Sequence, residues 1–156
     1  DLETTHIAIE TAETGHLVFG TLHTTTAAST VDRIIDQFPA DRQSQIRTML
    51  GSSLKGVIAQ TLCKKVPKGR IAALEIMICT NAISNLIREG KTFQIDSAMQ
   101  VGGKDGMVLL NKALLKHVQD GLIEPQEALN RSINRRDMME QLKSTEIDTS
   151  TLVAED

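Results

Sequence analysis

The 156 residues of this chain include no Trp, no Tyr and only three Phe. Proteins that bind single-stranded nucleic acid stack bases on aromatic side chains and present a basic surface. The formal net charge here is −3, and no basic block interrupts the sequence. We therefore expect no nucleic-acid partner.

Long apolar runs are absent as well, because none approaches the roughly 20 residues that a membrane-spanning helix requires. We also expect no signal peptide before Asp1. The two cysteines, Cys63 and Cys79, lie apart within apolar stretches, and neither they nor the histidines have the spacing of a metal site. These absences predict a cytosolic protein with reduced, packed cysteines, no transmembrane segment and no metal ligands.

The segment from Gly15 to Thr26 is the most informative part of what the chain does contain. Residues 16–23 are rich in large apolar side chains, which predicts a strand buried on both faces. A helical pattern over about residues 26–38 follows at once. Strand, polar turn and helix form one βα unit of a parallel sheet, and such sheets bind ligands beyond the carboxyl ends of their strands. His23 and the Thr cluster lie at that end.

Two histidines, His16 and His23, flank the predicted strand. Their separation of seven residues is odd, so on a straight strand the two side chains point to opposite faces. His16 lies at the amino end, away from the usual ligand side, which makes His23 the better candidate for chemistry. From spacing alone, a structural role in hydrogen bonding stays the alternative for both.

The rest of the first half alternates helical and extended patterns. Residues 3–14 predict a helix with Asp1 as a possible N-cap, and residues 41–56 predict another. Residues 57–63 and 71–78 predict two strands around the turn signal Pro67-Lys68-Gly69, which favours an antiparallel hairpin at a sheet edge. In the second strand, Leu74, Ile76 and Ile78 alternate with Glu75 and Met77.

Beyond residue 80 the patterns are only helical. Asn81 is expected to cap a helix over Ala82–Glu89 that stops at Gly90. The spacing of Ile83, Leu86 and Ile87 places them on one apolar face of this helix, with Arg88 and Glu89 off that face. Further helices are expected near residues 93–100, over 108–119, after Pro125 and over 137–143. These patterns predict a helical subdomain over residues 80–143, and the polar composition of residues 144–156 predicts a disordered tail.

One apparent nucleotide motif can be set aside. Gly90-Lys91-Thr92 looks like the end of a P-loop, but Asn85 stands where the first Gly is required, and the triplet follows a helix instead of a strand. No other window of the chain matches Gly-x-x-x-x-Gly-Lys-Ser/Thr. These residues therefore contain no phosphate cradle of that kind.

Three stretches resemble the C-terminal half of the PilT family, the retraction ATPases of type IV pili within the secretion ATPase superfamily. Asp1-Leu2-Glu3-Thr4 resembles the end of the family's Walker B segment, and residues 10–24 resemble its His box. Residues 82–89 resemble the motif characteristic of retraction motors, with Ser84 in place of its first Arg. The link from Cys63 to Gly69 is short and lacks the zinc-binding insertion of assembly-type relatives, which favours the retraction class.

The resemblance implies an α/β fold. Residues 1–79 would be the C-terminal portion of a RecA-like P-loop ATPase core, with a mostly parallel sheet and an edge hairpin, followed by the helical subdomain. It also implies a cytoplasmic motor, peripheral at the inner membrane, that forms a homo-hexamer and docks on the pilus platform protein. ATP and Mg²⁺ would be bound mainly by the family's Walker A loop, Asp box and Walker B Glu, which lie upstream of Asp1. We therefore expect this chain to be part of a longer protein.

The same resemblance implies roles for individual residues. His23 and His16 would be catalytic, and His23 would hydrogen-bond the γ-phosphate or its attacking water and report hydrolysis to the helix at 26–38. Thr24 would contact the cofactor. The retraction motif would consist of Ala82, Ile83, Asn85, Leu86, Ile87, Arg88 and Glu89.

Two functions are compatible with these features. In the first, the chain is part of a motor ATPase that couples ATP hydrolysis to pilus retraction in twitching motility, and it is inactive alone because it lacks the P-loop. In the second, it is a non-catalytic module for oligomerisation and partner docking. A Gly-x-x-x-x-Gly-Lys-Ser/Thr motif upstream of Asp1 would decide for the first.

Overall fold

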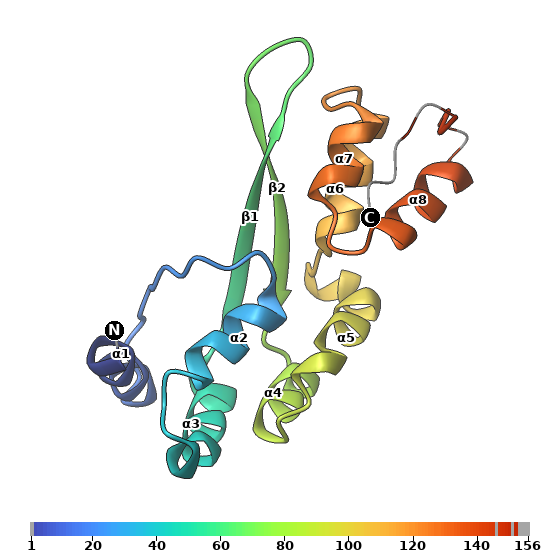
Figure 1. The fold of residues 1–156 in the computed structure, drawn as a ribbon. Helices are drawn as coiled ribbons and strands as arrows, with labels where there is room; N and C mark the ends of the chain where they lie inside the picture. The colour runs from blue at the N-terminus through green and yellow to red at the C-terminus, as the bar shows by residue number, and fades with distance from the viewer. Residues whose placement is uncertain (1, 146, 151, 153–156) are drawn as a thin grey trace. The chain divides into compact units, whose positions relative to one another are not determined.

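The computed structural model describes residues 2–145, 147–150 and 152 (Figure 1). Its elements are α1 (Leu2–Glu13), α2 (Ala27–Ile35), α3 (Ala40–Ser53), β1 (Gly56–Lys64), β2 (Arg70–Ile78), α4 (Asn81–Arg88), α5 (Ile95–Val101), α6 (Leu110–Gln119), α7 (Pro125–Arg131) and α8 (Arg135–Ser144). Short 3₁₀ turns cover Thr92–Gln94 and Gly102–Asp105. The predicted helices and hairpin are confirmed to within a few residues at their ends, and the α/β class is confirmed.

The chain forms two compact units. Unit 1 comprises residues 1–59 and 76–107, and unit 2 comprises residues 60–75 and 108–156. The β1–β2 hairpin thus contributes its base to unit 1 and its distal half to unit 2. A boundary at residue 80 between a RecA-like portion and a helical subdomain stays a prediction. Of the predicted tail, residues 146, 151 and 153–156 lie outside the described residues.

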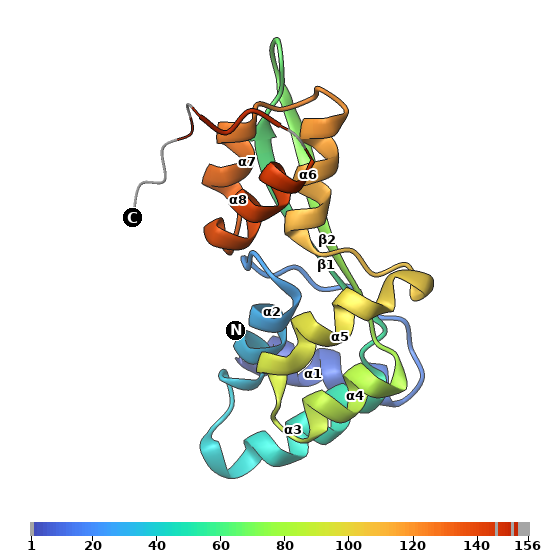
Figure 2. The same cartoon turned by 90° about the vertical axis from the view of Figure 1, so that its right-hand side faces the viewer.

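In unit 1, α3 and α4 pack against each other (Figure 2). The buried apolar side chains of this unit include Ile9, Ala27, Val31, Ile35, Phe38, Ile46, Leu50, Val57, Met77, Ile83, Ile87, Ile95 and Met99. Each of the larger side chains, from Val to Phe, contributes about 1.5–3 kcal/mol when it leaves water. Since α4 has only 8 residues, too few for a stable isolated helix, this burial holds it in place.

Unit 2 packs α6, α7 and α8 beside the distal half of the hairpin (Figure 2). Its core joins two strand residues to seven from the helical segment: Cys63, Ala73, Leu110, Leu114, Ile123, Ala128, Leu129, Met138 and Leu142. Strand and helices therefore share one apolar core.

The strand expected at residues 16–23 is not formed. Residues 16–24 lie outside any helix or strand, and the side chains of Leu17 and Phe19 are 75% and 88% exposed. A strand needs a neighbour for its backbone hydrogen bonds. Within the described ranges the single sheet is the two-stranded β1–β2 hairpin, so the expected parallel sheet is not formed by these residues.

The hairpin is antiparallel and keeps one register from base to turn. The Cys79 N–H donates to the Lys55 carbonyl at 2.9 Å, and the Lys65 N–H donates to the Gly69 carbonyl at 3.0 Å. In this register Lys64 lies opposite Arg70. Burial alternates along both strands, and Glu75 lies on the buried side, only 1% exposed.

The N-cap positions of α2 and α4 are both occupied by threonine. Thr26 caps α2, because its side chain accepts from the Ser29 N–H while the Ser29 hydroxyl accepts from the Thr26 N–H. Asn81 is not the cap of α4: Thr80 occupies the N-cap position without a side-chain bond, and Asn81 is the first helical residue. Gly90, with φ of 68°, follows α4 as predicted. The proposed cap Asp1 lies outside the described residues.

Candidate functional site

The Thr cluster is fixed to the first turn of α2. The hydroxyls of Thr24 and Thr30 hydrogen-bond at 2.7 Å, and the Thr30 hydroxyl also donates to the Thr26 carbonyl at 2.6 Å. Thr30 is only 6% exposed. The chain entering α2 is therefore tied to the helix by side-chain hydroxyls, which fixes the residue next to His23.

The two candidate histidines lie at opposite ends of the segment that joins α1 to α2. His16 is exposed, and its Nδ1 is 3.1 Å from the Thr14 hydroxyl. His23 is also exposed, and its ring makes no hydrogen bond among the described residues. The structure does not bring the two rings together. His23 is the one that lies beside the N-terminal end of a helix, where backbone N–H groups favour anions.

Helix α4, which carries the residues of the predicted retraction motif, has the predicted apolar and charged faces. Ile83 and Ile87 are fully buried, whereas Arg88 and Glu89 are exposed at the residue level. Glu89 pairs with Lys91, their charged atoms being 2.7 Å apart. The apolar face of the motif thus belongs to the core of unit 1.

Arg88 is nevertheless not a free surface charge. Its Nη2 donates to the Gly51 carbonyl at 3.2 Å, in the last turn of α3, and its Nη1 donates to Asn85 Oδ1 at 3.0 Å. The last four carbonyls of a helix have no partner within it, and a cation is favourable there. Asn85 therefore holds the guanidinium of Arg88, which caps the C-terminal end of α3 from α4. We call these two residues the bracket.

Gly51 marks the closest approach of these two helices. A Cβ added at Gly51 would lie 2.8 Å from Arg88 Cγ and 3.0 Å from the Ser84 carbonyl oxygen. Ser84, which stands where the motif has an Arg, is only 8% exposed. Ser84, the position at which the chain differs from the motif, therefore lies at a tight crossing of two helices, away from solvent.

Sequence reasoning missed two charged residues that organise the structure. The carboxylate of Glu75 accepts from the Leu110 N–H at 3.1 Å, at the first residue of α6. An acidic residue within an otherwise apolar strand was the available signal. The close approach of two helices at Gly51 had no such signal in the sequence, because a single Gly near the end of a helix equally indicates an ordinary helix end.

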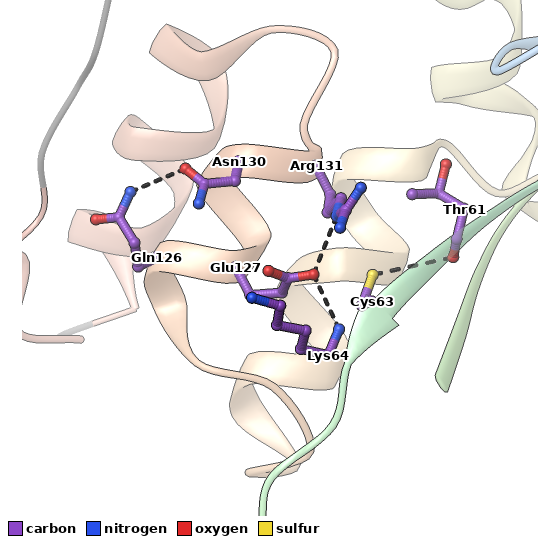
Figure 3. Close-up of polar contacts among 7 residues, drawn as sticks. All are labelled: Thr61, Cys63, Lys64, Gln126, Glu127, Asn130 and Arg131. Carbon is purple, nitrogen blue, oxygen red and sulfur yellow. Dashed lines mark hydrogen bonds and ion pairs between the residues drawn. The ribbon is translucent and has the colours of Figure 1, made fainter. Parts of the chain in front are cut away.

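The second missed residue is Glu127 on α7 (Figure 3). Its carboxylate accepts from the Lys64 N–H at 2.9 Å and from Arg131 Nε at 3.0 Å. Burial alone would raise the pKa of Glu127, but these bonds together with the charges of Arg131 and Lys64 lower it below its usual value. Glu127 therefore joins α7 to the edge of β1.

Both thiols are free and poorly ionised. Burial raises the pKa of Cys79 to about 11, against the opposing charge of Lys55. Burial likewise raises the pKa of Cys63, whose Sγ is 3.9 Å from the Thr61 carbonyl (Figure 3). Since the thiolate is the reactive form, these cysteines are packing residues, as predicted.

The described residues contain no group of three His, Cys, Asp or Glu side chains placed to hold a metal ion. No helix among them is both long and apolar enough to cross a bilayer. For a nucleotide, this part of the chain offers the exposed imidazole of His23, the hydroxyl of Thr24 and the N-terminal end of α2. That donor set suits the contact with one phosphate group and cannot by itself surround a triphosphate.

Comparisons with known proteins cover nearly the whole chain. Residues 1–131 match the family model described as type II/IV secretion system protein. The chain is 54% identical over 132 residues to the type IV pilus retraction ATPase PilT of Pseudomonas aeruginosa, covering 85% of the chain and 38% of the relative. It is 50% identical over 139 residues to a twitching motility protein of Neisseria gonorrhoeae, covering 88% of the chain and 37% of the relative.

Among solved structures, the crystal structure of the pilus retraction motor PilT with bound ADP matches with a TM-score of 0.81 at 44% identity. That match covers 90% of the chain and 39% of the solved one. The fold is therefore that of a partial RecA-like ATPase domain. The chain spans less than two fifths of the length of these relatives.

Proposed function

The chain belongs to the family of type II/IV secretion system proteins and, within it, to the PilT family, and from this premise we propose that it is part of a hexameric motor ATPase that couples ATP hydrolysis to type IV pilus retraction. The observation that carries the proposal is the high identity, over most of the chain, to a retraction ATPase and to a twitching motility protein. The close match to the structure of a retraction motor supports it.

In this proposal His23 serves the chemistry. Its exposed imidazole precedes α2 and has no hydrogen-bond partner in the described ranges, so it is free to contact a phosphate oxygen or the attacking water. The hydroxyl contacts of Thr24 and Thr26 link this position to α2. Phosphoryl transfer depends mainly on positioning and electrostatics, so one well-placed hydrogen bond can contribute to it. His16 and Thr24 would make secondary contacts.

ATP and Mg²⁺ would be held mainly by a phosphate-binding loop outside these 156 residues, none of which forms a Gly-x-x-x-x-Gly-Lys-Ser/Thr motif. When bound, the nucleotide supplies the phosphoryl group that is transferred to water. The chain's own contribution would be the imidazole of His23, the hydroxyl of Thr24 and the helix end described above.

The second component of the proposal is mechanical output through α4. Arg88 and Asn85 bracket α4 to the last turn of α3, while Ala82 and Glu89 face outward. Since α3 and α4 also pack against each other, a displacement of α3 would move the motif helix with it. We place the contact with the pilus platform on the outward face of α4 and the motor at the cytoplasmic side of the inner membrane.

The test of the chemistry is His23→Ala in the full-length parent protein. Loss of a group that acts on the transition state lowers kcat more than nucleotide affinity. We expect kcat for ATP hydrolysis to fall about a hundredfold while the Kd for nucleotide stays within a few fold. The exposed neighbour Thr25, changed to Ala, is the matched control and should keep both values. A His23→Ala enzyme with normal kcat would leave His23 a structural residue only.

The isolated chain provides a second test. Without the phosphate-binding loop, purified residues 1–156 should release no phosphate from ATP beyond a protein-free blank. Clear hydrolysis by this chain alone would contradict the assignment of ATP binding to residues outside it.

A further inference from the structure

The turn of the β1–β2 hairpin gathers positive charge. We call residues 64–70 the cationic tip; they include Lys64, Lys65, Lys68 and Arg70 and no acidic residue. All seven residues of the tip are exposed. The absence of acids extends much further along the sequence, since residues 42–74 contain Lys and Arg but no Asp or Glu. In a chain with net charge −3, this is a marked local excess.

The hairpin register places two of these cations against each other. Lys64 lies directly opposite Arg70 on the outward face, and like charges in that arrangement destabilise a strand pair. Lys65 belongs to the other face, and Lys68 lies in the turn. The charged residues therefore belong to both faces of the hairpin and to its turn.

Local acids balance only part of this charge. The Glu127 carboxylate near Lys64 already accepts from Arg131, and Asp120 pairs with Lys116. Lys65, Lys68 and Arg70 form no ion pair within the described residues. Glu124 is the remaining acid in the adjoining loop, and it is exposed.

The tip is also held in a defined position. The Val66 N–H donates to the Leu122 carbonyl at 2.9 Å, and the Lys64 N–H donates to Glu127 (Figure 3). Val66 and Pro67, at the end of the turn, are exposed, the former by 37%. The tip thus presents a small apolar end with cations around it on a fixed support.

From this arrangement we infer that the cationic tip binds an anionic phospholipid surface. A cluster of Lys and Arg is attracted to an anionic leaflet, and the exposed Val66 and Pro67 at the same end can enter the interface of a bilayer. Each Lys or Arg near an anionic leaflet strengthens binding by about fivefold, and the attraction decays within a Debye length of roughly 8 Å at physiological salt. This inference does not depend on ATP hydrolysis.

The test is vesicle sedimentation of the full-length protein. Vesicles of phosphatidylglycerol and phosphatidylethanolamine are compared with vesicles of phosphatidylcholine. The tip variant replaces Lys65, Lys68 and Arg70 by Gln, and leaves Lys64 because of its contact with α7. The matched control replaces Lys104, Lys112 and Lys143, three exposed cations elsewhere, by Gln and has the same net charge.

We expect the wild-type protein to bind the anionic vesicles only, and the tip variant to bind them about a hundredfold more weakly. The control should bind within a few fold of wild type. Equal weakening in both variants, or unchanged binding by the tip variant, would overturn the inference. Val66→Ser keeps every charge of the tip but removes an apolar side chain from its end. This variant should therefore weaken binding to vesicles without weakening binding to soluble polyglutamate. Binding to soluble polyglutamate as tight as to vesicles would overturn the lipid assignment in favour of an acidic protein.

Discussion

In unit 2, the buried carboxylate of Glu75 accepts a hydrogen bond from the first N–H of α6, whereas in unit 1 the exposed guanidinium of Arg88 donates to a carbonyl in the last turn of α3. Both contacts satisfy a helix end with a charged side chain from another element. They differ in their surroundings, because water can replace the guanidinium but cannot reach the N–H of Leu110, which is only 2% exposed.

This difference indicates different uses. A buried polar group without a hydrogen-bond partner costs the full free energy of its desolvation. The hydrogen bond between Glu75 and Leu110 is therefore costly to break. An exposed charged contact contributes little net free energy and opens easily. The Arg88 contact between α3 and α4, where we place the mechanical output, is therefore the more readily opened of the two, while the buried apolar faces hold these helices together.

Removing the buried contact should have the largest effect on stability. Glu75→Ala leaves the Leu110 N–H without an acceptor and opens a void, so we expect the free energy of unfolding to fall by about 3 kcal/mol. Urea denaturation measures this. Glu75→Gln, which keeps an acceptor oxygen, should lose clearly less. Equal losses in the two variants would show that the hydrogen bond to Leu110 is not what Glu75 contributes to stability.

The second contact of unit 2, at Glu127, should make stability depend on pH. Its pKa is lower in the folded chain, so it stabilises the fold above its ordinary pKa, and this contribution is lost as the pH falls through the folded value. At pH 7 we expect Glu127→Gln to be less stable by about 1.5 kcal/mol. The difference from wild type should vanish in acid. A difference that is constant down to pH 2 would rule out the ionised carboxylate as its cause.

The helix crossing of unit 1 is sensitive to volume more than to charge. Gly51→Ala inserts a methyl group against the Ser84 carbonyl and Arg88 Cγ. Overpacking costs about 1–3 kcal/mol, and Ala regains about 1 kcal/mol of helix propensity, so we expect a net loss of about 1 kcal/mol. Gly103→Ala, where an added Cβ meets no atom within 4 Å, is the control. A stabilised Gly51→Ala protein would contradict the close approach of α3 and α4.

The exposed bracket should have the smallest effect on stability. Arg88→Ala is expected to lower the free energy of unfolding by about 0.5 kcal/mol. Hydrogen exchange should nevertheless report it, as faster exchange of amides in the last turn of α3. Glu89 pairs with Lys91 and not with the last turn of α3, so Glu89→Ala should leave the exchange rates of those amides unchanged. Equal exchange rates in both variants would show that Arg88 does not cap α3.

Local patterns predicted the helices and the hairpin because each carries its own signal. The apolar spacing of Ile83 and Ile87, and the turn at Pro67-Lys68-Gly69, are sufficient for α4 and for β1–β2. Residues 16–23 have an equally strong strand pattern, yet they form no strand. The apolar pattern of residues 16–23 indicates only that these residues favour a buried strand. A strand also requires a neighbouring strand for its backbone hydrogen bonds, and the described residues supply none to this segment.

For the candidate site, the sequence located His23 and the sidedness of α4, and the roles of both stay predictions. It did not show that Arg88 caps α3 or that Ser84 is buried at a helix crossing. Those features depend on the distance between two helices, which the spacing of residues within one helix does not encode. The same holds for Glu75, whose partner Leu110 is 35 positions away.

The central claim is that chemistry and mechanical output are carried by different residues of one motor. The most direct measurement is ATP turnover together with pilus retraction for the Arg88→Ala/Glu89→Ala double variant of the full-length protein. We predict near-normal turnover and hexamer size with loss of retraction, because both side chains are exposed and α4 keeps its buried face. Normal retraction by this variant, with ATP turnover unchanged, would contradict the claim and leave α4 a structural helix.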